Sequence, residues 1–138
     1  MKKLLISILL SSITLLPTLA ANWAQIDAQG KNFVDTSSLR KEQDYNRNYV
    51  YSLWFKYLNN GDEYYTNIEK SYNKKVWYQL QKVSYDCKNK EFRIDTTSYY
   101  DLHGRIIITQ KGYNYNWNAV LPDSLSDTIY KEVCKGFY

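Results

Sequence analysis

The fold is decided by the stretch VWYQLQKVSYDC (residues 76–87), KNKE (88–91) and FRIDTTSYYD (92–101). Two runs rich in β-branched and aromatic residues flank a short polar turn, which is typical of an antiparallel hairpin. Apolar residues hold even positions up to Leu80 and odd positions from Val83, so we expect a bulge or bend near Gln81-Lys82. After the turn, apolar and polar residues are expected to alternate regularly over residues 92–100.

The N-terminal side of this hairpin predicts further strands. Asn22–Asp27 and Asn32–Asp35 have the pattern of a short hairpin, and Tyr49–Leu58 is the strongest strand because both of its faces are apolar or aromatic. Asp35–Leu39 is rich in capping residues and predicts one helical turn. Arg40–Arg47 is polar and predicts a solvated loop.

The segments that flank the hairpin are less regular. Glu63–Lys75 places three tyrosines among charged residues and predicts a long, exposed, partly extended excursion. Arg105–Gln110 contains a run of isoleucines that is typical of a covered strand, after a tight turn at Asp101–Gly104. Lys111–Asn118 is rich in Gly, Asn and Tyr and predicts a loop.

The N-terminus has the three parts of a secretory signal peptide. Two lysines precede the apolar run Leu4–Leu16, and Thr18-Leu19-Ala20 offers a cleavage site, with Ala21 as the alternative. The apolar run is too short for a membrane-spanning helix, which needs roughly 20 residues. We therefore expect residues 1–20 to be the signal peptide and residues 21–138 to form a single domain, without a lipid anchor or transmembrane segment.

The C-terminal segment predicts a helix, because Leu125, Ile129 and Val133 recur every four residues after a capping site at Asp123 or Ser124. The chain has two cysteines, Cys87 and Cys134. In an exported protein they suggest one disulfide, worth about 4 kcal/mol for a loop of roughly 50 residues. Two free thiols are the alternative. The expected fold is α+β: an antiparallel β-sheet of about six strands with the C-terminal helix packed on one face and tethered by the disulfide.

Catalytic and cofactor motifs are weak in this sequence. His103 is the single histidine and lies in a predicted turn, and the sequence has no paired metal-binding cysteines, Gly-x-Ser-x-Gly motif or glycine-rich phosphate loop. Asp86, Asp95 and Asp101 could meet as paired carboxylates, although turn or edge positions are the preferred interpretation. We expect no cofactor, no metal and no enzymatic activity. The formal charge of +4, which falls to +2 without the two signal lysines, is too small to indicate nucleic-acid binding.

The tyrosine content has two interpretations. The chain has 15 tyrosines and 4 tryptophans, which either fill a sheet with one solvated face or act as anchors at a protein interface. Basic residues lie near several loop tyrosines, and they either meet an acidic partner or form a solvated face. The candidate protein-binding residues are Tyr64, Tyr65, Tyr72, Lys74, Lys75, Lys88, Lys90, Tyr113 and Tyr115.

The order of features along the chain resembles the surface-adhesin protein E family of Gram-negative bacteria. The features are Trp23, Phe33-Val34-Asp35, Ser37-Ser38-Leu39, Trp54, Tyr85-Asp86-Cys87, Tyr99-Tyr100-Asp101 with Gly104, Trp117, Leu121-Pro122-Asp123-Ser124 and Val133-Cys134. The resemblance implies an antiparallel sheet with a C-terminal helix tethered by Cys87 and Cys134. It also implies attachment to host extracellular-matrix or serum proteins such as vitronectin, laminin or plasminogen.

The favoured hypothesis is an exported binding domain that engages a host protein or an envelope protein. The alternative is a periplasmic envelope-maintenance module or a lysozyme-type inhibitor. The protein is expected in the periplasm, at the outer membrane or outside the cell. An exposed sheet edge also makes a homodimer a hypothesis.

Overall fold

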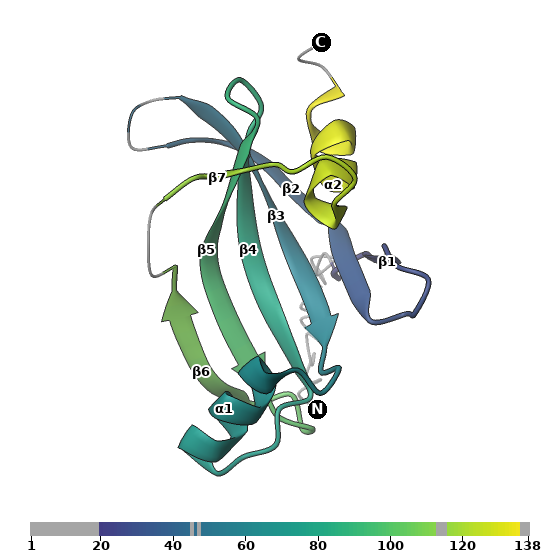
Figure 1. The fold of residues 1–138 in the computed structure, drawn as a ribbon, viewed down its shortest axis with the longest axis vertical. Coiled ribbons are helices and arrows are strands. Elements are labelled where there is room, and N and C mark those ends of the chain that lie inside the picture. The colour runs from purple at the N-terminus through teal and green to yellow at the C-terminus, as the bar shows by residue number, and fades with distance from the viewer. Residues whose placement is uncertain (1–19, 45, 47, 113–115, 136–138) are drawn as a thin grey trace, which may run out of the picture.

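The computed structural model describes residues 20–44, 46, 48–112 and 116–135. Figure 1 shows one antiparallel sheet whose strands lie side by side in chain order, with the short β7 paired to β5. The strands are β1 (Trp23–Gln25), β2 (Asn32–Gln43), β3 (Tyr49–Leu58), β4 (Tyr78–Asp86), β5 (Glu91–Tyr100), β6 (Ile106–Lys111) and β7 (Asn118–Ala119), and the helices are α1 (Glu63–Tyr72) and α2 (Leu125–Val133). The predicted α+β class, with a C-terminal helix on a sheet, is confirmed.

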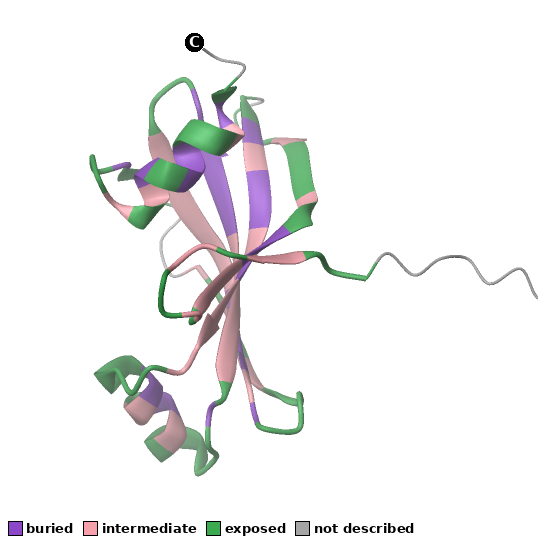
Figure 2. Cartoon of the chain, turned by 90° about the vertical axis from the view of Figure 1, so that its right-hand side faces the viewer, coloured by how far each residue is buried: buried purple, intermediate pink, exposed green. Residues whose placement is uncertain are grey.

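Both helices lie on the same face of the sheet, at its two ends (Figure 2). α2 covers the end near the β4–β5 turn, where Ile129 and Tyr130 join a core with Phe55 and Val83. α1 covers the other end through a smaller cluster that contains Tyr65, Ile68, Val76 and Tyr99. We call this the helix-covered face, and the other side of the sheet the open face.

The predicted irregularity at Gln81-Lys82 is confirmed, but the extra residue lies in the neighbouring strand. β4 pairs with β3 without interruption, whereas its register with β5 shifts between Lys82 and Val83. Lys82 pairs with Thr96 and Val83 with Ile94, so Asp95 is the additional residue. The predicted regular alternation over residues 92–100 is therefore wrong, because the β5 bulge reverses which positions face the helices.

A glycine fits closely against this bulge. The Gly112 N–H donates a hydrogen bond to the Asp95 carbonyl at 2.8 Å. A Cβ added at Gly112 would lie 2.1 Å from the carbonyl oxygen of Ile94, which is closer than real Cβ atoms come to backbone. The backbones of the two strands approach here at a distance that only glycine permits.

The N-terminal half corrects two predictions. Asp35–Leu39 forms no helical turn and Arg40–Arg47 is not simply a loop, because β2 runs through to Gln43. The register between β2 and β3 shifts between Asp35 and Arg40. Polar side chains of this segment form hydrogen bonds to backbone groups there. The Ser38 hydroxyl accepts a hydrogen bond from the Trp54 N–H at 2.9 Å in place of a strand carbonyl. Residues that favour helix caps thus satisfy a strand irregularity instead.

The segment Glu63–Lys75 is also different from its prediction, because most of it is helix α1 rather than an extended excursion. Tyr65 and Ile68 are the buried residues of this helix, with 5% and 8% of their surfaces exposed. They pack on Tyr99 of β5. The buried side of α1 consists of only these two residues, which are too few to show a helical repeat in the sequence. The helix therefore could not be predicted without knowing that they pack on Tyr99.

The predicted disulfide is present. Cys87 at the end of β4 and Cys134 at the end of α2 are bonded, with their Cα atoms 5.6 Å apart, and neither cysteine is free. The Tyr130 hydroxyl donates a buried hydrogen bond to the Cys87 carbonyl at 2.9 Å. Ser124 is the N-cap of α2 and accepts from the Asp127 N–H. The helix is therefore held by its cap, its apolar stripe and the covalent bond together.

Candidate functional site

The structure separates the predicted binding residues into two groups at opposite ends of the sheet. Tyr64, Tyr65 and Tyr72 lie on α1, and Lys74 and Lys75 lie in the turn that follows it. Lys88 and Lys90 lie in the β4–β5 turn near α2, where the Lys90 ammonium is 5.9 Å from the Tyr130 ring centroid. Tyr113 and Tyr115 lie outside the described residues.

Tyr65 differs from the other α1 tyrosines. It was predicted in an exposed loop, but it is buried in the helix and its ring meets the Tyr99 ring edge-on at 6.3 Å. Burial raises the pKa of Tyr65 to about 12, with the Asp62 carboxylate adding to the effect. Tyr64 and Tyr72, in contrast, are exposed. Tyr65 therefore fixes the helix on the sheet, while its neighbours face solvent.

Glu69 fixes the turn between α1 and β4. Its carboxylate accepts a hydrogen bond from the Lys75 ammonium at 2.9 Å and another from the Val76 N–H at 3.0 Å. The Lys75 ammonium, then the Val76 N–H, lower the pKa of the Glu69 carboxyl below its usual range. Asn73 ends the helix in the left-handed conformation and donates its N–H to the Glu69 carbonyl. One residue thus holds the basic turn in a defined place.

Asp101 fixes the turn between β5 and β6 in a similar way. It accepts hydrogen bonds from the backbone N–H groups of His103 at 2.9 Å and Arg105 at 3.0 Å, and from the Arg105 guanidinium at 2.8 Å. The Arg105 N–H is the largest cause that lowers the pKa of Asp101. Gly104 has a φ of 73°, which suits a glycine at this tight turn. His103 is therefore a turn residue, as predicted.

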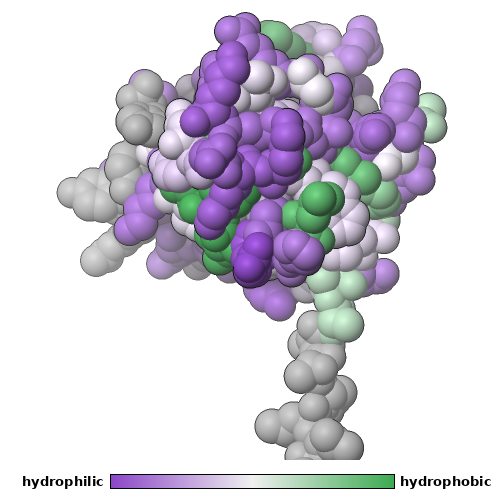
Figure 3. Space-filling view, turned by 90° about the horizontal axis from the view of Figure 1, so that it is seen from below, coloured by the Kyte–Doolittle hydropathy of each residue, from purple (hydrophilic) through white to green (hydrophobic). Residues whose placement is uncertain are grey.

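These two turns lie side by side and form one exposed surface. Lys74, Lys75, Leu102, His103 and Arg105 line a shared shallow hollow of about 200 Å³. We call this hollow, together with the exposed Tyr72 and Trp77, which flank its two lysines in the chain, the α1-end surface. Figure 3 views the molecule from below, where hydrophilic side chains dominate and smaller hydrophobic patches interrupt them. The sequence analysis identified Tyr72 and the two lysines of this surface, but not the tryptophan or the β5–β6 turn.

Trp77 is the large aromatic side chain of this surface, and 47% of it is exposed. Its ring meets the Tyr78 ring edge-on at 5.8 Å, and Tyr78 in turn stacks on Tyr100 at 4.7 Å. The Lys56 ammonium lies 4.5 Å from the Tyr78 ring centroid. The Trp77 N–H also donates to the Tyr100 carbonyl at 2.8 Å. The tryptophan is therefore held in place although nearly half of it faces solvent.

The charge of the α1-end surface is basic and only partly neutralised. Lys75 pairs with Glu69 and Arg105 pairs with Asp101, yet the side chains of Lys75 and Arg105 stay 81% and 72% exposed. Lys74 makes no ion pair within the described part of the chain. Aromatic residues and arginine are enriched at protein interfaces, which favours Trp77 and Arg105 as contact residues. The lysines give the surface its positive charge.

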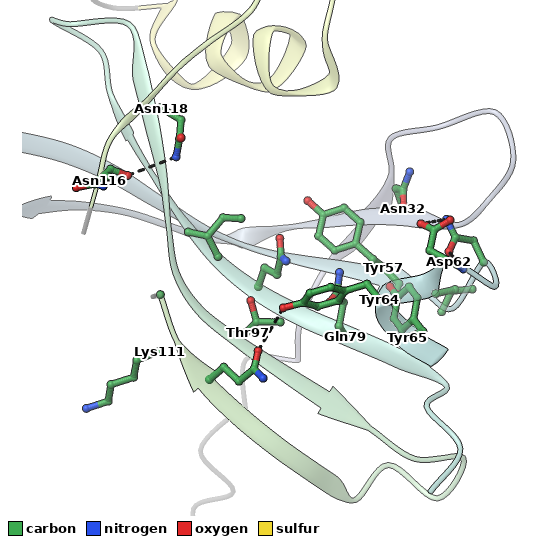
Figure 4. A pocket seen from close by; sticks show the side chains of 16 residues that line it. Asn32, Tyr57, Asp62, Tyr64, Tyr65, Gln79, Thr97, Lys111, Asn116 and Asn118 are labelled. Carbon is green, nitrogen blue, oxygen red and sulfur yellow. Dashed lines mark hydrogen bonds between the residues drawn. The ribbon is translucent and has the colours of Figure 1, made fainter. Parts of the chain in front are cut away.

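A second hollow lies on the helix-covered face, between α1 and the segment that leads into β7 (Figure 4). Its volume is about 520 Å³, and seven of its sixteen lining residues carry carboxamide side chains. The Tyr57 and Tyr64 rings lie at its side, with Gln79 and Thr97 projecting from the sheet between them (Figure 4). We call this hollow the amide pocket. Sequence reasoning found its tyrosines Tyr64 and Tyr65 but missed the glutamines, which the β5 bulge and strand register bring together.

The amide pocket contains hydrogen-bonding groups that are incompletely used. The Gln79 side-chain oxygen is buried and has no hydrogen-bond partner in the part of the chain that the structure describes. The Tyr64 hydroxyl makes a long hydrogen bond of 3.4 Å to the Gln110 side-chain oxygen. Burial raises the pKa of Tyr57, followed by smaller effects of Tyr85 and Tyr65, so its phenol is neutral at physiological pH.

The three acidic residues considered as paired carboxylates have separate structural partners. Asp86 accepts from the Lys88 and Asn89 N–H groups in the β4–β5 turn. Asp95 accepts from Ser84 and Arg93 beside the β5 bulge, and Asp101 holds the β5–β6 turn. Over residues 20–44, 46, 48–112 and 116–135, no group of three or more His, Cys, Asp or Glu residues could hold a metal ion.

The same described residues contain no helix that is long and apolar enough to cross a membrane. No curated protein and no solved structure matches the chain. A family model does match, and its match extends from the first strand to the residue after the disulfide-bonded Cys134. Because the model described as Surface-adhesin protein E covers residues 23–135 of the 138-residue chain, this protein belongs to the surface-adhesin protein E family.

Proposed function

We propose that this protein is an exported adhesin that binds a host extracellular-matrix or serum protein through the α1-end surface. Membership of the surface-adhesin family supports a surface-adhesin-like, non-enzymatic binding protein. The observation that carries the choice of surface is Trp77, an exposed tryptophan that follows the exposed Lys74 and Lys75 within three residues of the chain and whose ring contacts the Tyr78 ring. The family match does not favour the alternative of an envelope-maintenance module or lysozyme-type inhibitor.

Pre-organisation of Trp77 favours binding through this surface. Binding orders side chains at an interface, and a ring that is already held costs less entropy to immobilise than a free one. Trp77 is held by its ring contact with Tyr78 and by its backbone hydrogen bond to Tyr100. Tryptophan and arginine are enriched among interface residues that dominate affinity. Arg105 and the two lysines would guide the encounter with an acidic segment of the partner.

The binding test uses the mature chain against immobilised vitronectin, laminin and plasminogen at physiological salt. Trp77→Ala is expected to weaken binding about 30-fold, which corresponds to a hot-spot loss of about 2 kcal/mol. Lys74→Glu should weaken binding more strongly at low salt than at high salt, because the lysine acts through its charge and salt screens that charge. Lys88→Glu is the matched control, since it makes the same charge change in an exposed turn at the other end of the sheet.

Two outcomes would overturn the proposal. Absence of saturable binding to any of the three proteins would remove the host-protein function. Binding that survives Trp77→Ala and Lys74→Glu but is lost in Lys88→Glu would move the ligand to the α2 end.

Export is the second part of the proposal. We infer that residues 1–20 are a signal peptide and that the mature chain reaches the outside of the cell, which family membership supports in its coarser form of an exported protein. Protease shaving of intact cells, with a periplasmic protein as control, measures this directly. Loss of the protein while the control survives is expected, whereas full protection with release by osmotic shock would contradict surface attachment.

A further inference from the structure

We infer that the amide pocket is a binding site for a neutral saccharide, separate from the α1-end surface and from the protein ligand proposed for it. The pocket lies on the helix-covered face, between α1 and the sheet (Figure 4). Its volume of about 520 Å³ is within the size of small-ligand sites. The charge, the hydrogen-bonding groups and the aromatic surface of the pocket all suit such a ligand.

The charge of the pocket favours a neutral ligand. Asp62 and Lys111 are the two charged residues among those that line it, one of each sign. Asp62 precedes α1, and one of its carboxylate oxygens already accepts a hydrogen bond from the Asn60 side chain at 2.8 Å. An anionic or cationic ligand would therefore find no excess of opposite charge here.

The hydrogen-bonding groups suit hydroxyls. A carboxamide presents an acceptor and two donors in one plane, and a sugar hydroxyl both donates and accepts. Gln79 and Gln81 project from β4 on the same face of the sheet, and Gln110 of β6 lies on that face in register with Gln81, with Thr97 between them. Gln81 makes no side-chain hydrogen bond with a described residue, and its neighbour Gln79 has its oxygen buried without a donor. If the Gln79 amide turns toward the pocket, a ligand hydroxyl can donate to its oxygen, which removes the cost of this unpaired buried acceptor.

The tyrosines supply the apolar part of the site. The rings of Tyr64 and Tyr57 lie near each other at the pocket (Figure 4), and 58% of Tyr64 is exposed. An aromatic ring gives an apolar surface for the C–H face of a sugar ring, while its hydroxyl remains available for a hydrogen bond. The Tyr64 hydroxyl makes a long bond to Gln110, and the Tyr64 ring contacts the Tyr99 ring at 6.0 Å, which holds it at the pocket.

The test titrates the full exported protein with maltose, lactose and N,N′-diacetylchitobiose, and follows backbone amide shifts by NMR. Saturable shifts confined to residues of the pocket are expected with at least one of these neutral disaccharides. Tyr64→Ala should weaken that affinity about tenfold or more. Tyr72→Ala is the matched control, because it removes an exposed tyrosine from the same helix but outside the pocket.

A second variant, Gln81→Leu, keeps the side-chain size while it removes the amide, and it should also weaken binding. The inference is overturned if none of the three disaccharides gives saturable shifts, or if Tyr64→Ala and Tyr72→Ala weaken binding equally. A stronger response to a sialylated or sulfated disaccharide than to the neutral ones would also overturn it. Comparison with an array of neutral glycans then distinguishes a free sugar from a glycan chain as the natural source.

The two proposals fail separately. Trp77→Ala should leave saccharide binding unchanged while it weakens binding to the protein ligand, and Tyr64→Ala should weaken saccharide binding. If Trp77→Ala also removed saccharide binding, the two sites would not be independent and the inference would fail as stated.

Discussion

Removal of the Cys87–Cys134 disulfide should lower the melting temperature strongly without abolishing the sheet. The bond joins residues 47 positions apart, and the closed loop contains the strands β5, β6 and β7 as well as α2. Other interactions of α2 do not depend on the bond. Ile129 is buried in the core and the Tyr130 hydroxyl donates to the Cys87 carbonyl. The helix should therefore stay docked in the reduced protein.

The magnitude follows from the length of the loop. In the chain-entropy model, a loop of this length stabilises the folded state by about 4 kcal/mol. A domain of about 115 residues unfolds with an entropy of about 0.24 kcal/mol/K, so this free energy corresponds to a fall of about 17 °C in melting temperature. Residual structure in the unfolded chain would make the fall smaller.

The assay is thermal unfolding of Cys134→Ser and of the Cys87→Ala/Cys134→Ala double variant, followed by far-UV circular dichroism. Wild-type protein in a reducing agent should melt near the double variant, and all forms should show the sheet signal below the transition. An unchanged melting temperature in the double variant would refute the reasoning. Loss of the sheet signal before heating would refute the claim that the remaining α2 contacts suffice.

Three further changes test other parts of the fold. Glu69→Gln should lower the melting temperature at pH 7, and this effect should disappear as the pH falls toward about 3. The pKa of Glu69 is lower in the folded protein than in the unfolded chain, so its carboxylate stabilises the fold fully above the unfolded pKa of about 4.3 and no longer does so once it is protonated. A difference in melting temperature between variant and wild type that stays constant from about pH 7 to about pH 3 would contradict this. Gly112→Ala should cost about 1–3 kcal/mol in denaturant unfolding, since its Cβ would collide with the Ile94 carbonyl, and a variant as stable as wild type would show that the strands separate easily there. Ser124→Ala should cost about 1 kcal/mol by loss of the α2 N-cap, whereas Ser124→Asp, which keeps a capping oxygen, should cost less.

Elements with a dense local pattern could be predicted from the sequence. β3 has the bounds predicted for it, Tyr49–Leu58. A continuous run of apolar and aromatic residues is typical of a strand that is covered on both faces. The C-terminal helix was visible from the four-residue spacing and its capping residue. The disulfide followed from the cysteine count, and its two residues indeed come together at the ends of β4 and α2.

Elements that depend on distant partners could not be predicted. α1 buries Tyr65 and Ile68 against Tyr99, which lies more than 30 residues further along the chain. The β5 bulge at Asp95 lies beside the expected position at Gln81-Lys82, but β4 itself pairs with β3 without a break. The change of parity in β4 arises because Leu80 faces the open face while Val83 faces the helices, so it did not reveal the strand that carries the bulge. Trp77 lies just before β4 begins, and a strand pattern alone assigns it to the sheet rather than to the exposed surface.

The same helix explains why two proposed sites can coexist at one end of a small sheet. α1 is attached through two buried residues, Tyr65 and Ile68, whereas Tyr64 turns toward the amide pocket and Tyr72 adjoins the α1-end surface. A helix with so few buried contacts contributes little to the core around Phe55 and the disulfide, which lies at the α2 end. Substitutions on its exposed sides therefore change the binding surfaces at small cost to global stability. The sheet, α2 and the disulfide supply the frame, and α1 with its two neighbouring turns supplies exposed side chains to both proposed sites.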